Sequence, residues 1–591
     1  RRWTLVGPAG GPAAAVDPAG LVTPRLGGWS LDWWVGADDR WRLPSAEPSL
    51  RQSLVEATPV VETLVRVPAG DAVHRCFGVP GFLVVEVENR SPSPFALALV
   101  VRPYDPLGAT VVRSVAVDGD QVLVDGRVAV VLAGRPGRVA ASTGAAGDVA
   151  GVVLGGAAAP AVDGGGAATL GLVACPDGLA SAAVLVPVAH RATVRAVVPL
   201  DGGSGPVDGL PSAAVAVRGW RAQSRGGMQA NVPDPRLQRA FDAARRTLLL
   251  VEGQDPGPAE GTALAVAALA RTGRHAEADE LVRTLWCRQR SDGSFDEPTG
   301  RGAPGGPHLW ALGEHLRLRP DAGLAGALDR SLVAAEGWLR EVEASDPAGP
   351  GSRLEPSGSM EGRWAAAGRW LAGHSAGEAG LAAAAASLFG GLGAAGGPSS
   401  TAADVLALAA ARGGGLGRPA IAGPAGFDVV ATAAAAAAEV AAGDPAAEER
   451  LAWLLEVGEP TWAWPDHVHP RTGAGSEGRG HSPAATAAFV LLVRDLLIIE
   501  PAPGQATVLP LLPEGWRGQA LEVDDVPLAG GIRLSFAVRW HGERPALLWE
   551  ATAPLRLTAP GLDRSFSATG ARGEALLAGA PVATGATVEL S

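Results

Sequence analysis

The sequence contains no lysine, so all 49 of its Lys+Arg residues are arginines. This absence excludes a pyridoxal phosphate enzyme that uses a Schiff-base lysine, and it also excludes the lysine of a phosphate-binding Walker loop. Tyrosine occurs once and methionine twice in a chain of 591 residues that is rich in Ala, Gly and Arg. That composition is typical of GC-rich coding bias, so the missing lysine does not by itself indicate a function.

Cysteine is almost as scarce. Cys76, Cys175 and Cys287 are far apart, odd in number and without CxxC spacing, which argues against a disulfide framework and against a structural zinc site. We therefore expect a reducing, cytoplasmic environment. The first residues lack the apolar core of a signal peptide, although a leader that has already been removed stays possible because the chain does not start with Met.

Long apolar runs and excess positive charge are missing too. Even the alanine tract at 432–440 is soon interrupted by Gly, Asp and Pro, so no transmembrane helix is expected. The formal charge of −12 argues against a nucleic-acid partner, because phosphate binding needs a dense basic face. No cofactor is predicted, and the sequence does not indicate the oligomeric state.

The length predicts several domains. Residues 1–217 show short apolar runs separated by turn residues, a spacing that favours an antiparallel β-sandwich. The clearest runs are 82–89, 95–103, 109–117 and 121–133. Four early tryptophans are expected to fill the core or a domain contact rather than to stack on a sugar: Trp29, Trp33, Trp34 and Trp41.

Residues 233–500 change to a helical spacing. Asp234 is a plausible N-cap with Pro235 at the first helical position. Without intervening strands, successive helices imply helical hairpins, close to the number that an (α/α)6 toroid needs. The expected helices are 259–271, 274–290, 306–318, 322–344, 374–390, 401–412, 427–443, 444–457 and 482–499. Residues 501–591 return to a strand period, which predicts a small C-terminal β-sandwich and a multidomain α+β fold.

The string at 271–295 resembles the first hairpins of (α/α)-toroid glycosidases, in which a helix ending in Q-x-x-DG-x leads to the mouth of the ring. Here the motif is Gln289, Asp292 and Gly293, followed by Phe295. The segments 356–385 and 461–497 resemble the acid and base segments of the glucoamylase-like branch, the family 15 glycoside hydrolases. The second segment has a Trp-rich loop, a PxTG turn and a His-Ser pair that opens the last inner helix.

The resemblance implies an inverting glycoside hydrolase that acts on an oligo- or polysaccharide, with an α-glucan as one option. Such an enzyme needs a carboxylic acid and a facing carboxylate that activates water. By position, Glu361 is the acid and Asp466 is the base. Predicted substrate contacts are Asp255, Trp310, Trp364, His374, Trp462, Trp464, His467 and His481.

Several positions depart from the family pattern. The base is Asp rather than Glu, Arg479 stands within a triplet that is usually Gly-Asp-Gly, and the usual Arg-Asp of the first hairpin is replaced by Gln254-Asp255. Glu361 could instead be a first-turn carboxylate favoured by the helix dipole, and Asp466 a turn residue. The alternative is therefore a catalytically degenerate carbohydrate-binding or structural protein on the same scaffold.

Other classes fit less well. The pair His467 and His469 is weak evidence for a metal site, and none is predicted. Isoprenoid cyclases share the Q-x-x-DG turn, but they use repeated Gln-Trp motifs and a helical DxDD that this chain lacks. Toroid polysaccharide lyases usually need a catalytic tyrosine, and Tyr104 lies in the N-terminal β-rich region.

Overall fold

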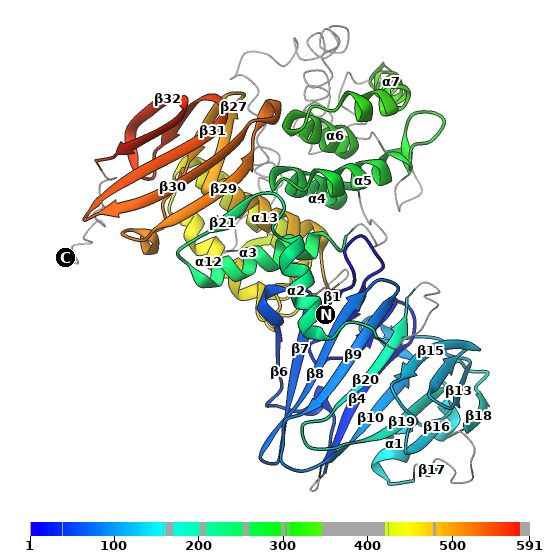
Figure 1. The fold of residues 1–591 in the computed structure, drawn as a ribbon. Helices are drawn as coiled ribbons and strands as arrows, with labels where there is room; N and C mark the ends of the chain where they lie inside the picture. Colours follow the sequence, from blue (N-terminus) through cyan, green and yellow to red (C-terminus); the bar gives the residue numbers. More distant parts are fainter. Residues whose placement is uncertain are drawn as a thin grey trace, which may run out of the picture. The chain divides into compact units, whose positions relative to one another are not determined.

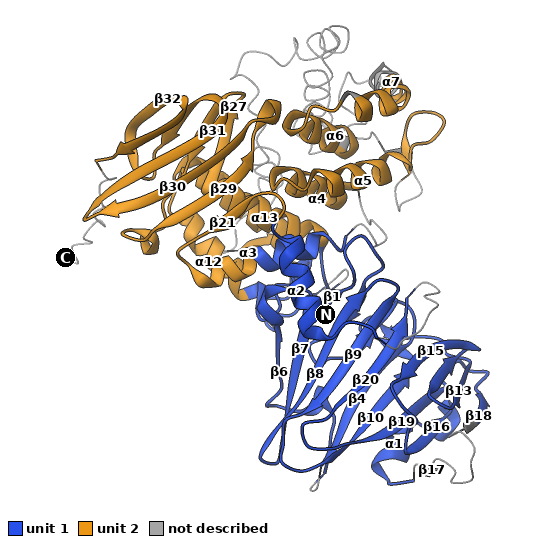
Figure 2. Cartoon of the chain, in the orientation of Figure 1, with its two compact units in different colours: residues 1–225, 242–255, 457–482 blue, residues 226–241, 256–456, 483–591 orange. Residues whose placement is uncertain are grey.

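A computed structural model describes the chain over most of its length. The described residues are 2–37, 40–157, 159–160, 169–200, 209–251, 259–296, 302–303, 306–344, 420–423, 425–476 and 480–578. They form two compact units (Figure 2). Unit 1 comprises residues 1–225, 242–255 and 457–482, and unit 2 comprises residues 226–241, 256–456 and 483–591. Two later segments of the chain therefore belong to the same unit as the N-terminal residues.

Unit 1 contains two large sheets (Figure 1). The first has the strand order β1-β2-β3-β4-β10-β19-β16-β17, with β5 paired to β4, and the second has the order β18-β13-β14-β15-β20-β9-β8-β7-β6. The first sheet consists of β1 (Thr4–Val6), β2 (Ala14–Val16), β3 (Val22–Thr23), β4 (Ser30–Ala37), β5 (Arg40–Arg42), β10 (Phe95–Arg102), β16 (Arg138–Ser142), β17 (Ala159–Pro160) and β19 (Ser181–Val188). The second consists of β6 (Arg51–Leu54), β7 (Val60–Val67), β8 (Gly70–Val79), β9 (Phe82–Asn89), β13 (Ser114–Asp118), β14 (Gln121–Val124), β15 (Arg127–Leu132), β18 (Thr169–Ala174) and β20 (Thr193–Pro199).

Alternating apolar residues explain these strands and their core. Val61, Leu83 and Val85 from one sheet pack in the same buried cluster as Leu97 and Val184 from the other. Each sheet therefore buries one face against a common core, as strands of period two require. The expected runs 82–89, 95–103 and 121–133 correspond closely to β9, β10 and the β14–β15 hairpin.

Two of the four early tryptophans are fully buried, as predicted. They are neighbours in β4 and point to opposite faces of the sheet. Trp33 joins the core shared by the two sheets, whereas Trp34 packs in a smaller cluster on the other face. Trp29 and Trp41 are only partly buried against these clusters.

Two helices in unit 1 differ from the all-β expectation. Helix α1 (Val149–Leu154) lies on the outer face of the first sheet, and helix α2 (Ala213–Gln223) packs on β8. In α2 the residues Ala213, Val217 and Trp220 are buried at helical spacing. The alternating Ala and Val residues of 213–217 also match a strand period, so the β prediction was wrong there.

The helices of the middle of the chain match the predicted ones, and the first of them contributes residues to both units. Asp234 caps α3 through Oδ1, which accepts from the N–H groups of Arg236 and Leu237 at 2.7 and 3.2 Å. The helices are α3 (Pro235–Leu248), α4 (Ala259–Arg271), α5 (His275–Trp286), α6 (Gly306–Leu318), α7 (Ala322–Ala344), α11 (Val429–Ala442), α12 (Ala446–Gly458) and α13 (Pro483–Leu497). The expected helices at 374–390 and 401–412 lie outside the described residues.

Helices α4, α6 and α13 pack around one another although they are far apart in sequence. Helix α4 contacts α5, α6 and α13, and α13 also contacts α11. A Cβ added at Gly261 would lie 3.3 Å from the Cβ of Ala484, so α4 and α13 approach closely at their N-terminal ends. Arg271 and Asp495 meet at the C-terminal ends of the same two helices. Helices α4 and α13 therefore run parallel, with apolar residues buried on every side.

The C-terminal part of unit 2 forms a seven-stranded sheet with the order β21-β29-β30-β31-β28-β27 and with β32 paired to β31. The strands are β21 (Gln229–Asn231), β27 (Ile498–Ala502), β28 (Gln505–Val508), β29 (Leu521–Pro527), β30 (Arg533–His541), β31 (Arg544–Ala559) and β32 (Asp563–Leu576). The mixed α+β composition of the chain is thus confirmed. No helix within the described ranges is long and apolar enough to cross a membrane.

Candidate functional site

The loop before α13 is fixed to the N-terminus of the chain within unit 1. The Thr4 and Thr461 hydroxyls are 2.6 Å apart, and Trp3 N–H donates to Gly480 C=O over 3.2 Å. Ser482 N–H donates to Trp464 C=O over 2.7 Å, which joins the two ends of the loop. The loop therefore has a defined conformation set by contacts at both ends.

Trp464 supports this loop from inside. Its ring is fully buried and lies on the backbone of Gly458, where an added Cβ would come within 2.7 Å of Cζ2. Only glycine leaves room for the indole at this position. The burial favours a role in holding the loop, since the ring has no exposed face for a sugar.

Asp466 stands at the entrance of a tight hairpin. His467 C=O accepts from Ser476 N–H at 3.0 Å, and His469 N–H donates to Ala474 C=O over 2.8 Å. Gly473, with φ of 65°, closes the turn in a conformation that glycine adopts without strain. The short strand β26 (His467–Val468) follows Asp466 directly, and the Asp466 side chain is half-buried. The hairpin thus fixes the backbone next to Asp466, whose side chain is still partly accessible.

Trp462 has an unusual backbone conformation. Its φ is 55° and its side chain is 5% exposed. A bulky residue in the left-handed region costs on the order of 1–3 kcal/mol, and such residues cluster at functional sites. The strain is consistent with a loop shaped for a role beyond packing.

His481 is the most unusual polar group beside this loop. It is 3% exposed, and neither ring nitrogen has a hydrogen-bond partner among the described residues. Burial lowers the pKa of His481 to about 4, so the imidazole is neutral at neutral pH. A neutral imidazole has one donor and one acceptor, and a sugar hydroxyl could satisfy either.

A second group of predicted residues lies in unit 2, on the turn between α5 and α6. Gly293 has φ of 90°, and an added Cβ would lie 2.1 Å from Ala334 C=O, so only glycine allows the turn to pack on α7. Gln289 Nε2 donates to Ser331 C=O over 2.7 Å, which attaches the turn to the same helix. These contacts give the Q-x-x-DG motif a structural role.

Aromatic rings fill the space behind that turn. Phe295 stacks on His308 with ring centroids 3.7 Å apart, and Trp286 meets Phe295 edge-on at 5.4 Å. His308 is almost fully buried, burial lowers its pKa to about 3, and neither nitrogen has a described partner. His308 was not among the predicted residues. Its position directly after Pro307, at the start of α6, was the available signal.

The predicted residues fall into three sets. The loop in unit 1 brings together Asp466, Trp462, Trp464, His467 and His481 on one segment, 461–482. Trp310 lies in α6 of unit 2 and is fully buried. Asp255, Glu361, Trp364 and His374 lie outside the described residues. In the part of the chain that the structure describes, no three His, Cys, Asp or Glu side chains form a group that could hold a metal ion.

No protein family profile and no curated protein sequence matches the chain. Several solved structures have partly similar folds. One is described as a candidate kojibiose phosphorylase from the human microbiome, with 7% identity and a TM-score of 0.45 over 96% of this chain and 90% of the other.

Another is the α-L-rhamnosidase of Streptomyces avermitilis, with 14% identity and a TM-score of 0.31 over 80% of this chain and 48% of the other. A third is the family GH92 α-mannosidase of Bacteroides thetaiotaomicron, with 9% identity and a TM-score of 0.33 over 90% of this chain and 86% of the other. All three TM-scores are below 0.5, so the likeness carries no argument about this chain.

Proposed function

We propose that the chain is a glycoside hydrolase that cleaves an oligo- or polysaccharide with inversion, using Asp466 as the general base and Glu361 as the general acid. The observation that carries this proposal is the half-buried Asp466 carboxylate at the entrance of a fixed hairpin, on the segment that also holds the buried, neutral His481. A partly accessible carboxylate on a fixed loop, on the same segment as a neutral hydrogen-bonding ring, suits the activation of water next to a sugar.

In this proposal the Asp466 carboxylate accepts a proton from water as the water oxygen attacks the anomeric carbon. The Glu361 carboxyl group donates its proton to the leaving glycosidic oxygen, and the bond to that oxygen breaks. An inverting reaction needs the two carboxyl groups roughly 6.5–9.5 Å apart, so that water fits between the base and the sugar. The His481 imidazole would bind a sugar hydroxyl through whichever ring nitrogen is free.

The helix arrangement supports the finer fold proposal, an (α/α)6 toroid between two β-sandwiches. Helices α4 and α13 run parallel, and α5 follows α4 in a hairpin. Parallel helices linked through antiparallel ones are what a toroid requires of its inner and outer rings. Helix α13 is the last helix of the predicted toroid and contacts α4, one of the first, as closure of a ring demands.

The remaining predicted residues divide by burial. Trp310 and Trp464 are fully buried and Trp462 nearly so, so we assign each of them to packing within its own unit rather than to stacking on substrate. His467 is half-buried, and its contact with substrate stays part of the proposal. Asp255, Trp364 and His374 stay as proposed substrate contacts on the basis of the resemblance.

The test is a screen of the wild-type protein against α- and β-linked oligosaccharides, with the anomeric form of the first product followed by proton NMR. We expect turnover with inversion on at least one substrate, and loss of turnover in Glu361→Gln without loss of folding. Retention of configuration would overturn the assigned mechanism. Binding without turnover on every glycan would instead establish the non-catalytic alternative.

A further inference from the structure

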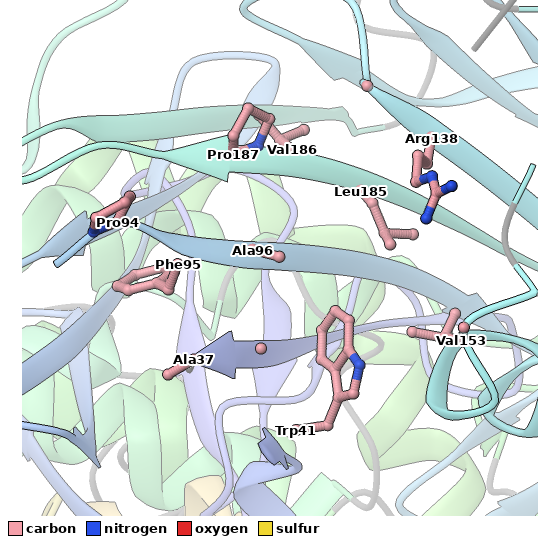
Figure 3. Close-up of a pocket in the computed structure, with 13 residues that line it drawn as sticks. Ala37, Trp41, Pro94, Phe95, Ala96, Arg138, Val153, Leu185, Val186 and Pro187 are labelled. Atoms are coloured by element: carbon pink, nitrogen blue, oxygen red, sulfur yellow. The ribbon is translucent and has the colours of Figure 1, made fainter. Parts of the chain in front are cut away.

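A pocket of about 600 Å³ opens on the outer face of the first sheet of unit 1, on the side of the sheet away from the shared core (Figure 3). Strands β4, β5, β10, β16 and β19 contribute to its walls, together with the end of α1. In the figure, Val153 lies at one end and Pro94 at the other. This volume is within the range of small-molecule binding sites.

Trp41 provides a flat wall in this pocket. It is paired with Gly36 across β4 and β5, and a Cβ added at Gly36 would lie 3.1 Å from three atoms of the indole. The ring therefore rests on bare backbone, and the missing side chain at Gly36 is what allows this close approach. The side chain is half-buried and lines the pocket, so the platform is formed before any ligand binds.

Among the described residues that line the pocket, Arg138 is the only charged one. It is exposed on β16, and among the described residues it has no ion pair and no side-chain hydrogen bond. Other arginines of unit 1 are held in ion pairs, as in the Arg102–Asp32 and Arg195–Glu86 bridges. The other lining residues, including Phe95, Leu185 and Pro187, are apolar.

We propose that this pocket binds a sugar ring of an acidic glycan, with the ring stacked on Trp41 and its carboxylate on Arg138. A sugar ring has an apolar C–H face that fits an indole and polar edges that need donors. A guanidinium binds a carboxylate through two parallel hydrogen bonds. Because the chain carries a formal charge of −12, general attraction of polyanions would not explain binding at this one position.

This inference rests on the proposed function only in taking a glycan as the ligand class. The pocket and the loop of Asp466 use different residues of unit 1, so binding and turnover can be lost independently. The site would tether the protein to an acidic polysaccharide while the reaction takes place elsewhere in the molecule.

The experiment is calorimetric titration of the full chain with an oligogalacturonide and with a neutral maltooligosaccharide of equal length, at low and at moderate salt. We expect the acidic ligand to bind more tightly and to weaken as salt is added. Trp41→Ala should weaken its binding at least about tenfold. Arg138→Gln should weaken it by a similar factor, about tenfold, while changing the neutral ligand by less than about twofold.

Matched controls are Trp540→Ala, a half-buried tryptophan of unit 2, and Arg127→Gln, an exposed arginine on β15. Both should bind as wild type. Ala96→Glu keeps Trp41 in place but puts a negative charge on the pocket wall, so it should abolish binding even if Trp41→Ala does not fold.

Three results would overturn the inference: no binding by wild type, equal binding in the pocket variants, or equal affinity for both ligands. Turnover measured on the same variants separates the two proposals. Pocket variants that lose binding but keep turnover support both the pocket proposal and the hydrolase proposal. A wild type that binds the acidic glycan without any turnover contradicts the hydrolase proposal only.

Discussion

Buried histidines are the residues that most clearly set the response of this protein to acid. His74 on β8 stacks on Trp33 with ring centroids 4.9 Å apart, and burial lowers the pKa of His74 to about 3. Burial lowers the pKa of His308 to about 3 and that of His481 to about 4. Each of these rings is held neutral in the folded state by the loss of water around it.

Acidification should therefore begin to destabilise the fold as the pH falls below the ordinary pKa of histidine, about 6.5. The unfolded chain takes up a proton on His74 near pH 6.5, whereas the folded protein does so only near pH 3, so the stabilisation is present above about pH 6.5 and is lost as pH falls below it. Between about pH 7 and about pH 5, His74 alone should lower the free energy of unfolding by about 2 kcal/mol. Denaturant unfolding of His74→Phe, which keeps a ring on Trp33, should show a correspondingly shallower pH dependence.

Phe77→Leu is the matched control, because Phe77 is a buried, non-titrating residue of the same strand. It should lower the free energy of unfolding by the same amount at each pH. A His74→Phe variant with the wild-type pH dependence would show that His74 is not held neutral.

For single residues, the sequence suggested candidate site residues but not the burial or hydrogen bonding of their side chains. Asp466, His467 and His481 were predicted from the motif around them, and their roles stay a prediction. That His481 is buried without a partner depends on contacts with residues distant in the chain, such as the approach of Trp3 to Gly480, which no local pattern encodes.

At the scale of elements, the helices of unit 2 are joined at their C-terminal ends by a buried network of charges. Glu314 of α6 accepts from Arg271 of α4 and from Arg317, each over 2.7 Å. Asp495 of α13 pairs with Arg271 and Arg494, and Glu500 of β27 pairs with Arg317. Three arginines and three carboxylates thus balance in charge where α4, α6 and α13 meet.

Removing one member should destabilise this junction strongly. Glu314 is fully buried, and the two arginines hold its pKa far below the ordinary value. Glu314→Gln removes one of the two carboxylates that pair with each of Arg271 and Arg317. It should lower the free energy of unfolding by about 3 kcal/mol. The measurement is denaturant unfolding at neutral pH.

An exposed ion pair serves as the control for the buried network. Arg221 and Glu56 are 59% and 55% exposed, so Arg221→Gln should cost less than about 1 kcal/mol. Equal effects of Arg221→Gln and Glu314→Gln would show that the buried network does not stabilise the helix junction.

The helices themselves were predictable, and their charge network was not. Asp234 as a cap predicted the start of α3, and apolar spacing with the Gly and Pro breaks predicted the bounds of α4, α6 and α7. The network joins Arg271, Glu314 and Asp495, which lie on three separate helices. Their pairing follows only once the helices are placed side by side, so charge position along the sequence does not reveal it.

At the scale of the whole molecule, unit 1 is completed by segments that come late in the chain. Gly10 N–H donates to Leu249 C=O over 3.1 Å, and Arg246 donates to Glu56 and Ala57 carbonyls at 2.9 and 2.8 Å. The segment 457–482 adds the hydrogen bonds to Trp3 and Thr4. A fragment that ends where the sequence changes from strand spacing to helical spacing would lack both segments.

A fragment of residues 1–225 should therefore be less stable than unit 1 in the intact chain. Several hydrogen bonds and buried contacts are lost, so its melting temperature should be lower by roughly 10 °C. A longer fragment, 1–255, restores the contacts of Arg246 and Leu249 and should recover part of the difference. Circular dichroism melts of both fragments and the full chain are the measurement, and a 1–225 fragment as stable as unit 1 in the intact chain would contradict this division.

The sequence predicted where strands and helices occur along the chain, but it could not predict that segment 457–482 belongs to unit 1. Local spacing shows where strands and helices form, whereas the assignment of 457–482 to unit 1 depends on contacts of this segment with the N-terminal residues, such as Trp3 and Thr4. The same long-range contacts shape the loop of Asp466, which is why its Trp side chains turned out to be buried rather than exposed toward a ligand.

The central claim is that Asp466 activates water for cleavage of a glycosidic bond, and the most direct test is the turnover of Asp466→Asn on the substrate that the wild type cleaves. The exposed Asp120 provides the control variant Asp120→Asn. We predict that Asp466→Asn lowers kcat by about 10²–10⁴-fold while substrate binding and the unfolding midpoint stay close to wild type, and that Asp120→Asn changes none of them. A kcat of Asp466→Asn equal to that of wild type would contradict the account.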